Sequence, residues 1–471
     1  MADTLPLKLR LARGVGALAR LRGGGATTLP GKVLMRMDPG AIAALGRRLA
    51  RGSLLISGTN GKTTTAAMTS SILDRAGLSL VHNQAGANMA GGVATSLLAA
   101  TRAGGEIEGE LGLFEVDEMW LASIAGQLRP EAILLTNLFR DQLDRYGELD
   151  AIADRWEQAL RSLGSELVLN ADDPLLADLG REHPGPTYFG VDDDKLALAG
   201  MAHAVDAKHC RRCGAPYVFD AVYLGHLGHY HCPSCGQRRP GPSVRATDVS
   251  LEGVRSARFT LHTPAGRAEV LLALPGLYNV YNALAAAALA TTLEVPLQTI
   301  VEGLKSTRAA FGRAETVTLS PNAGRDVGGD GAAPRQLRIL LIKNPTGANE
   351  VLRTLALEPG QHDLLAVLND NIADGRDVSW IWDADFELLA GRIRVVTCSG
   401  TRAPELALRL KYAGVEPSRI RVQADLGIAL REAASDRAAG DTPLYALPTY
   451  TAMLSLRDLL VARGEARSAW S

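Results

Sequence analysis

The sequence has no apolar run as long as a membrane span, no excess of either charge and few cysteines. Its 471 residues include 50 basic and 51 acidic residues, which gives a net charge of −1. Balanced charge argues against a protein whose main partner is nucleic acid. An apolar content of 46% without a run of membrane length is typical of a soluble globular protein. The length predicts two or three domains rather than one core.

The five cysteines follow a pattern typical of metal binding. Four of them form two Cys-x-x-Cys pairs, Cys210 with Cys213 and Cys232 with Cys235, and glycine follows each pair. Four thiolates at this spacing predict one tetrahedral Zn²⁺ in a zinc ribbon, and a site with no open position is structural. Redox pairs or unmetallated thiols are the alternatives. Cysteines used in this way indicate a reducing compartment, so we expect the chain in the cytoplasm.

The ribbon is predicted to be an insertion at residues 205–245, because a strand pattern resumes after it at 268–272. Three histidines lie between the two cysteine pairs, His226, His229 and His231. Since the cysteines already complete a four-ligand site, we interpret these histidines as surface residues of the ribbon.

A glycine-rich turn follows the apolar run 54–56 and ends in Gly-Lys-Thr. A strand, a glycine turn and a helix in this order predict a phosphate-binding loop, because glycines let backbone N–H groups approach phosphate oxygens. Lys62 would add a positive charge and Thr63 a hydroxyl for Mg²⁺, so we expect ATP with Mg²⁺. The predicted loop residues are Gly58, Thr59, Asn60, Gly61, Lys62, Thr63 and Thr64. A simple glycine turn is the alternative, since Ile56 stands where the general pattern has another glycine.

A second apolar strand is predicted at 111–114, and carboxylates begin directly after it at Glu115. Acidic groups at the carboxyl ends of parallel strands lie where Mg²⁺-nucleotide binds in such sheets. Glu115 is therefore a candidate Mg²⁺ ligand together with Thr63. Further apolar strands at 132–137 and 167–170, with helical segments between them, predict an α/β fold with a doubly wound parallel sheet.

Residues 1–24 interleave lysine and arginine with leucine, and Asp3 is the only acidic residue there. Basic residues interrupt every apolar stretch, so a cleavable signal peptide is not expected. The pattern predicts an amphipathic helix. This helix either rests on anionic lipid at the inner face of the membrane or packs on its own domain, and we favour the second interpretation.

A second α/β unit is predicted from Phe311 onward, with apolar strands at 337–342 and 364–368. The stretch 320–336 is rich in Gly, Asp and Pro, which predicts a flexible loop.

Several aspartates follow the strand at 364–368, within residues 369–383. Asx caps in a solvated turn explain Asp370 and Asp374 well. Asp377 directly precedes a run that contains aromatic residues, and such a turn does not explain it, so we select Asp377 as the candidate functional acid.

In order along the chain, these motifs resemble the central ATPase domain of the Mur ligase family. The matching segments are 58–64, Glu115-Val116, Thr136-Asn137, 141–144, 170–173, 188–190, 275–283 and 312–315. Members of that family, like folylpolyglutamate synthetase, use ATP to phosphorylate a carboxylate, and an amine then attacks the acyl phosphate. The resemblance implies catalytic roles for Lys62 and Glu115. It also implies that Asn279 and Asn282 lie near the nucleotide base and Arg313 near the ribose or phosphates.

The resemblance implies three parts of the chain. These are a basic helix and lead-in at 1–50, a Mur ligase-type ATPase domain with the ribbon insertion at 51–310, and a C-terminal, Rossmann-like α/β domain that binds a partner at 311–471.

The sequence departs from the family's pattern at three positions. Gln142 occupies the position where the family usually has a metal-associated histidine. Trp156 occupies the position of a carbamoylated lysine, and Tyr278 that of another histidine. Any Mg²⁺ ligands beyond Thr63 and Glu115 are therefore left open.

The C-terminal half is similar to one branch of the family, the MurT subunits of lipid II isoglutaminyl synthases. The segments that carry this similarity are 374–380, 399–402 and 450–453. The similarity implies a heterodimer with a GatD-like glutamine amidotransferase, whose Cys and His release ammonia from glutamine. It further implies that Asp377 completes their catalytic triad.

The implied reaction is the ATP-dependent amidation of the D-glutamate α-carboxylate of the lipid II stem peptide to D-isoglutamine. One alternative is a stand-alone ligase that adds an amino acid to a carboxylate, as folylpolyglutamate synthetase does. Another is a nucleic-acid-binding ATPase that reads its target through the zinc ribbon. The near-neutral charge and the lack of interleaved aromatic and basic residues count against this last class.

Overall fold

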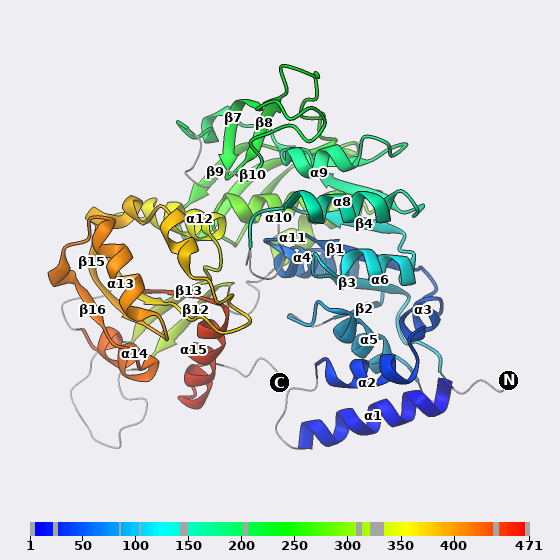
Figure 1. Cartoon of the computed structure of the whole chain (residues 1–471), viewed down its shortest axis with the longest axis horizontal. Coiled ribbons are helices and arrows are strands. Elements are labelled where there is room, and N and C mark those ends of the chain that lie inside the picture. The colour runs from blue at the N-terminus through cyan, green and yellow to red at the C-terminus, as the bar shows by residue number, and fades with distance from the viewer. Residues whose placement is uncertain are drawn as a thin grey trace.

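The computed structural model describes nine stretches of the chain, which form two α/β units side by side (Figure 1). The described residues are 5–21, 27–83, 86–102, 105–141, 149–200, 206–307, 313–320, 334–436 and 442–466. The side chains of residues 19–21 and of Arg313 lie outside this description.

Within the described residues, the first unit is built on a nine-stranded sheet with the order β11-β10-β9-β6-β5-β4-β1-β3-β2. From β9 to β2 neighbouring strands pair in parallel, and β10 and β11 extend the sheet through antiparallel pairs. The bounds are β1 (Ser53–Ser57), β2 (Leu80–His82), β3 (Leu111–Glu115), β4 (Ala132–Leu135), β5 (Glu166–Asn170), β6 (Thr187–Val191), β9 (Val244–Glu252), β10 (Ser256–Thr263) and β11 (Gly266–Leu272).

Helices cover both faces of this sheet, as expected for strands that are apolar on both sides. On β1, Leu54 and Ile56 belong to one core and Leu55 to the other, because successive side chains point to opposite faces. The first core is closed by α4 (Lys62–Arg75), α10 (Leu277–Thr292) and α11 (Leu297–Ser306). The second is closed by α1 (Leu5–Leu21), α2 (Leu29–Met37), α3 (Ala41–Gly46), α5 (Ala90–Ala99), α6 (Leu121–Leu128), α8 (Leu149–Leu160) and α9 (Pro174–Leu179).

The cysteine-rich insertion forms a separate two-stranded hairpin of β7 (Val218–Leu224) and β8 (Leu227–His231), after the short 3-10 helix η1 (Asp194–Leu196). It lies at the top of the molecule in Figure 1, beside β9 and β10.

The second unit has a six-stranded sheet, counted over the described residues, with the order β12-β13-β17-β14-β15-β16. Only the β12–β13 pair is antiparallel. The strands are β12 (Arg313–Leu319), β13 (Arg335–Leu340), β14 (His362–Val367), β15 (Ile393–Ser399), β16 (Ile420–Val422) and β17 (Leu444–Pro448).

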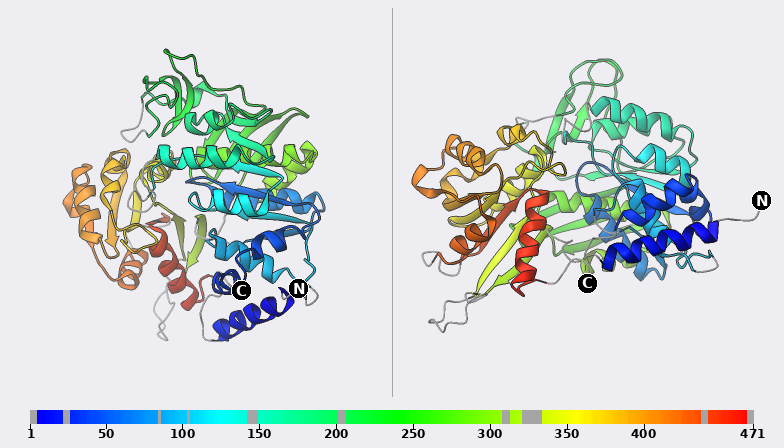
Figure 2. Two further views of the ribbon diagram at one scale, coloured as in Figure 1. Left: turned by 45° about the vertical axis from the view of Figure 1, so that its right-hand side comes forward. Right: turned by 60° about the horizontal axis from the view of Figure 1, so that its bottom comes forward.

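Helices again pack on both faces of the second sheet, as the two views of Figure 2 show. One face carries α12 (Pro345–Ala356), α13 (Ala403–Tyr412) and the 3-10 helices η2 (Ser379–Asp383) and η3 (Phe386–Arg392). The other carries α14 (Leu426–Ala434) and α15 (Tyr450–Ala462), and η4 (Pro417–Arg419) precedes β16.

The predicted α/β class with parallel sheets is confirmed. Individual boundaries differ, since the strand expected at 337–342 is β13 and starts at Arg335. The described residues of segment 1–50 pack onto the first sheet, and Leu5, Leu9 and Leu34 join its second core. The predicted flexible loop 320–336 falls largely outside the described residues.

Helix α1 lies at the outer edge of the first unit (Figure 1), and its two faces differ in burial. Leu5, Leu9 and Ala12 are buried against the domain, whereas Leu7 and Leu11 are 62% and 54% exposed. Packing on its own domain therefore explains only the inner face. No helix of the described residues has the length and apolarity needed to cross a bilayer.

Candidate functional site

The predicted phosphate loop runs from the end of β1 to the start of α4, and two glycines shape it. Gly58 and Gly61 have φ angles of 136° and 85°, which side chains rarely allow. A Cβ on Gly58 would lie 2.3 Å from Thr136 Oγ1, so only glycine fits there. The loop therefore has the backbone geometry that a strand-to-helix anion site requires.

Residues that follow β4 hold the loop from one side. The Thr59 hydroxyl donates to the backbone oxygen of Phe139 (3.1 Å) and accepts from its N–H (3.0 Å). The backbone N–H of Asn60 donates to Asn137 Oδ1 at 2.8 Å. Segment 137–139 thus fixes the loop at two successive residues.

Lys62 is buried at the N-terminus of α4 and forms an ion pair with Glu118, with Nζ 3.0 Å from Oε2. The ammonium also donates to the backbone oxygens of Gly58 and Thr59. Burial alone lowers the pKa of Lys62, but the Glu118, Glu115 and Asp117 carboxylates outweigh it and raise that pKa. Lys62 is therefore fully charged at neutral pH, as a phosphate-binding lysine must be.

Thr63 and Glu115, the two predicted Mg²⁺ ligands, meet in the structure. Thr63 Oγ1 donates to Glu115 Oε2 at 2.9 Å. Asn83 fixes the Glu115 backbone, because its side chain accepts from Glu115 N–H and donates to Glu115 O, both at 2.8 Å. A hydroxyl and a carboxylate that converge beside a phosphate loop suit the hard-oxygen preference of Mg²⁺.

Glu118 is a residue of the site that our sequence analysis did not select. It lies three residues beyond Glu115, and the clue was its place among the carboxylates after β3. Trp156, one of the three departures from the family's pattern noted above, donates from Nε1 to the Glu118 backbone oxygen at 2.9 Å. The indole thus fixes the backbone at Glu118, whose carboxylate pairs with Lys62.

Asn282 lies against the phosphate loop, with Oδ1 3.3 Å from Thr65 Oγ1. A Cβ on Gly61 would lie 2.0 Å from the same oxygen. Asn282 in turn donates to Asn279 Oδ1 at 3.1 Å. The two asparagines form one buried pair on α10 beside the loop. The Arg313 side chain and Gln142 lie outside the described residues.

The second unit contacts the phosphate loop directly through the start of α12. Lys343 Nζ donates to the Thr59 backbone oxygen at 3.0 Å and pairs with the Asp141 carboxylate. Asn344 and Asn60 exchange side-chain hydrogen bonds of 3.0 and 3.3 Å. The only sequence signal for this contact was the position of Lys343, directly before Asn-Pro at the end of a strand. That position alone does not distinguish a residue that contacts the phosphate loop from one on the surface.

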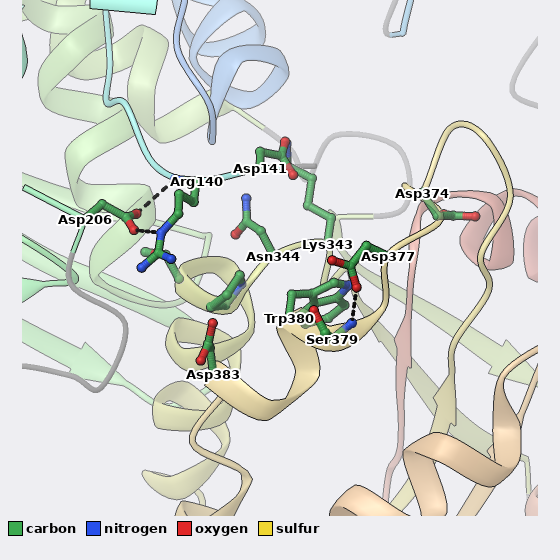
Figure 3. A pocket seen from close by; sticks show the side chains of 12 residues that line it. Arg140, Asp141, Asp206, Lys343, Asn344, Asp374, Asp377, Ser379, Trp380 and Asp383 are labelled. Atoms are coloured by element: carbon green, nitrogen blue, oxygen red, sulfur yellow. Dashed lines mark hydrogen bonds and ion pairs between the residues drawn. The ribbon is translucent and has the colours of Figure 1, made fainter. Parts of the chain in front are cut away.

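Asp377 lines a pocket between the two units together with Lys343 and Asp141 (Figure 3). Its carboxylate is exposed and accepts a hydrogen bond from the Ser379 backbone N–H at 2.8 Å. Hydrogen bonds from Ser379 lower the pKa of Asp377, so it is ionised at neutral pH. The other lining residues are Arg140, Asp206, Asn344, Pro345, Thr346, Asp374, Ser379, Trp380 and Asp383.

Asp374, by contrast, is turned toward α15 (Figure 3) and is buried. Its carboxylate accepts from the backbone N–H and the hydroxyl of Thr451. These bonds connect the loop to α15, so Asp374 is a buried tertiary contact and the Asx cap in a solvated turn expected from the sequence was wrong for this residue.

The four cysteines of the insertion converge, with all four sulfur atoms within 4.8 Å of one another. Sγ of Cys210 is 3.5 Å from Sγ of Cys235, and Cys213 and Cys232 are equally close. About 3.8 Å is expected between thiolates of a tetrahedral site with Zn–S bonds of about 2.3 Å. The backbone N–H of Cys235 chiefly lowers the pKa of Cys232, to about 6. The residues present therefore fit one tetrahedral metal ion.

The histidines of the hairpin require one correction. His229 and His231 are partly exposed, but His226 is completely buried, so placing it on the ribbon surface was wrong. The β7–β8 turn points into the first unit, where the His226 ring packs on Phe139 with centroids 4.7 Å apart. A turn is normally exposed, and the sequence contained no signal for this contact.

Comparison with known proteins places the chain in a family. Residues 56–211 match the Mur ligase middle domain, and residues 341–453 match the MurT ligase C-terminal domain. The MurT subunit of lipid II isoglutaminyl synthase (glutamine-hydrolyzing) from Streptococcus pneumoniae strain R6 is 35% identical, over 95% of this chain and 94% of that one. The chain belongs to the MurT family.

Another MurT subunit, from Staphylococcus aureus strain N315, is 30% identical over 96% of this chain and 97% of its own. Solved structures show that this MurT-family chain has the Mur ligase fold. A pseudomurein peptide ligase type C from Methanothermus fervidus has a TM-score of 0.64 at 22% identity, over 89% of this chain and 80% of that one. MurF from Thermotoga maritima in complex with ADP reaches 0.60 at 16% identity, with coverages of 91% and 83%.

Proposed function

We propose that this chain is the ligase subunit of a lipid II isoglutaminyl synthase. The α-carboxylate of D-glutamate in the lipid II stem peptide attacks the γ-phosphorus of ATP, forming an acyl phosphate and releasing ADP. Ammonia then attacks the carbonyl carbon, the C–O bond to phosphate breaks, and the nitrogen loses a proton to give the amide of D-isoglutamine. The phosphoryl step is needed because a carboxylate oxygen is a poor leaving group.

The phosphate loop and its neighbours supply the electrostatics of the first step. Lys62 and the loop N–H groups would neutralise the β- and γ-phosphates, while Asn279, Asn282 and Arg313 would contact the rest of the nucleotide. Thr63 and Glu115 would hold Mg²⁺, which supplies charge neutralisation when bound. Glu118 and Lys343 orient this cluster from either side of the loop.

The observation that carries the proposal is the pocket shared by Asp377 and Lys343. Lys343 contacts the phosphate loop, and Asp377 presents an ionised carboxylate on the surface of the same pocket. A triad aspartate must orient a histidine and stabilise its cation. We therefore assign Asp377 to the triad of a GatD-like glutamine amidotransferase that docks here and releases ammonia beside the ligase site.

Two further assignments belong to this proposal. Zn²⁺ is the metal proposed for Cys210, Cys213, Cys232 and Cys235, where four thiolates would make it structural. The reaction places the chain in the cytoplasm. The exposed leucines of α1 would bring it to the inner face of the membrane, where a lipid-linked substrate lies.

The proposal is tested by measuring ATP- and glutamine-dependent amidation of lipid II by this chain, with and without a co-expressed GatD-like subunit. Product that forms only with both subunits supports it. Product formed by the chain alone with an amino acid, and none with glutamine, would instead establish a stand-alone ligase.

A further inference from the structure

The β7–β8 hairpin joins two sites that the proposed function treats as separate. Its open end carries the cysteines, because four residues separate one Cys-x-x-Cys pair from the start of β7 and the other pair begins directly after β8. Its turn, Gly225-His226, lies at the opposite end, and a seven-residue strand such as β7 spans about 20 Å. In Figure 1 the hairpin runs inward from the outer edge toward the first unit.

The turn is packed between both units of the molecule. Gly225 has a φ of 59°, and a Cβ there would lie 2.9 Å from the Phe139 ring and 3.3 Å from Thr346 Cγ2. The backbone N–H of Gly228 donates to the Asp172 backbone oxygen at 2.9 Å, which ties the hairpin to the segment after β5. The turn therefore cannot move without moving its neighbours in both units.

His226 completes this contact with a buried side chain. Its Nε2 lies 3.4 Å from Asp173 Oδ1, and both groups are fully buried. Neither ring nitrogen has a hydrogen bond of normal geometry to any described residue. The His226 ring is therefore held by packing and by the nearby Asp173 carboxylate, not by a full set of hydrogen bonds. A small shift of the hairpin turn would change these contacts.

The residues that His226 contacts are those that hold the phosphate loop. Asp173 Oδ2 accepts from the Leu138 backbone N–H at 2.9 Å. Phe139, whose ring packs on His226, makes both backbone hydrogen bonds to the Thr59 hydroxyl. Contacts thus run without a gap from the hairpin turn through segment 138–139 to the phosphate loop.

We propose that the hairpin turn positions the phosphate loop, with His226 as the positioning residue, so that metal at the four-cysteine cluster sets the affinity for Mg²⁺-nucleotide. Metal binding holds the open ends of the two strands together and thereby presses the turn against Phe139. Loss of the metal would relax this contact and lower nucleotide affinity, although the cysteines contact no residue of the loop themselves. The inference rests on the nucleotide-binding part of the proposed function.

The first test titrates the full-length chain with a non-hydrolysable ATP analogue and Mg²⁺. We expect the Kd to rise about tenfold in His226→Ala, because small displacements of a binding group have large effects. Val218→Ala, which shortens an exposed side chain of the same hairpin, is the matched control and should leave Kd unchanged. His226→Phe keeps a ring on Phe139 without the Asp173 contact. It should unfold at nearly the wild-type temperature while Kd still rises, and a wild-type Kd in that folded variant would overturn the proposal.

The second test uses non-additivity to show whether the turn transmits the effect of the metal. Cys213→Ser removes one ligand, and zinc content is measured directly. We expect weaker nucleotide binding in this variant and no further loss when His226→Ala is added. Fully additive losses, or an unchanged Kd in zinc-free Cys213→Ser, would refute the coupling. A wild-type chain that binds no nucleotide would instead contradict the proposed function itself.

Discussion

Lys62 and Asp377 lie in opposite environments, although the proposed function gives both a part in one overall reaction. Lys62 is buried, and the carboxylate of Glu118 balances its positive charge. The buried charge at the phosphate loop therefore has its ion-pair partner within this chain. Asp377 is exposed, and its carboxylate contacts Ser379 of its own loop. Under the proposed function, the buried region acts on the nucleotide and the exposed carboxylate meets a group brought by the partner subunit.

The largest expected effect comes from the buried region. Lys62→Ala should abolish ATP-dependent amidation, because the phosphates lose their fixed positive charge. Glutamine hydrolysis by the assembled pair should persist. The amide product is measured by mass spectrometry, with Lys195→Ala, at an exposed lysine, as the control. Retained amidation would refute the role of Lys62.

The exposed region is tested by Asp377→Asn. Glutamine hydrolysis of the assembled pair should fall by about a hundredfold, because an amide cannot stabilise the histidine cation of a triad. Nucleotide binding by the ligase subunit should not change. Asp383→Asn, on the same pocket, is the control. If the two variants hydrolyse glutamine equally well, Asp377 is not the triad residue.

Glu118→Gln tests whether the buried pair contributes to stability. Loss of the charge next to buried Lys62 should lower the free energy of unfolding by about 3 kcal/mol at pH 7. Burial raises the pKa of Glu118, but Lys62 and Lys343 outweigh it and lower the net value below the usual 4.5. The stabilisation is therefore present above pH 4.5 and is lost as the pH falls through the folded-state pKa.

Denaturant unfolding of wild type and Glu118→Gln at neutral and acidic pH measures this effect. The difference between them should shrink below pH 4.5. Glu108→Gln, in an exposed pair with Arg102, should change stability little at either pH. A difference that stays constant with pH would show that the charge of Glu118 is not the cause.

Lys343→Met tests whether the contact between the second unit and the phosphate loop matters for catalysis. It removes the contact with Thr59 and Asp141, so kcat/KM for ATP should fall by about tenfold. Steady-state kinetics of the assembled pair provide the measurement, and Lys411→Met on α13 is an exposed control. Wild-type kinetics would mean that the second unit does not need this contact to position the loop.

The smallest effect is expected at α1, far from both regions. Replacing exposed Leu7 and Leu11 with glutamate should reduce co-sedimentation with anionic vesicles several-fold. Leu408→Glu, at an exposed leucine of α13, is the control. If wild type, the Leu7/Leu11 double variant and Leu408→Glu sediment equally, α1 does not bind the membrane and that part of the proposed function is wrong.

Much of the fold and part of the site could be predicted, because the signals were local. Apolar strands that alternate with helices indicated the parallel sheets, and the Gly58–Thr64 stretch indicated the phosphate loop between β1 and α4. Glu118 and His226 were not predicted. A carboxylate three residues beyond a better candidate, or a histidine in a hairpin turn, has no pattern that distinguishes a buried partner from a surface residue.

The sequence by itself determined the features that depend on neighbouring residues. Glycine spacing sets the turn of the phosphate loop, two Cys-x-x-Cys pairs bring four thiols within reach of one ion, and apolar runs specify buried strands. Only the tertiary structure decided which distant groups meet. Lys343 lies 284 residues from Thr59, and His226 reaches Phe139 across a hairpin turn. Such contacts follow from the packing of whole units against each other, a property that no local stretch of sequence contains.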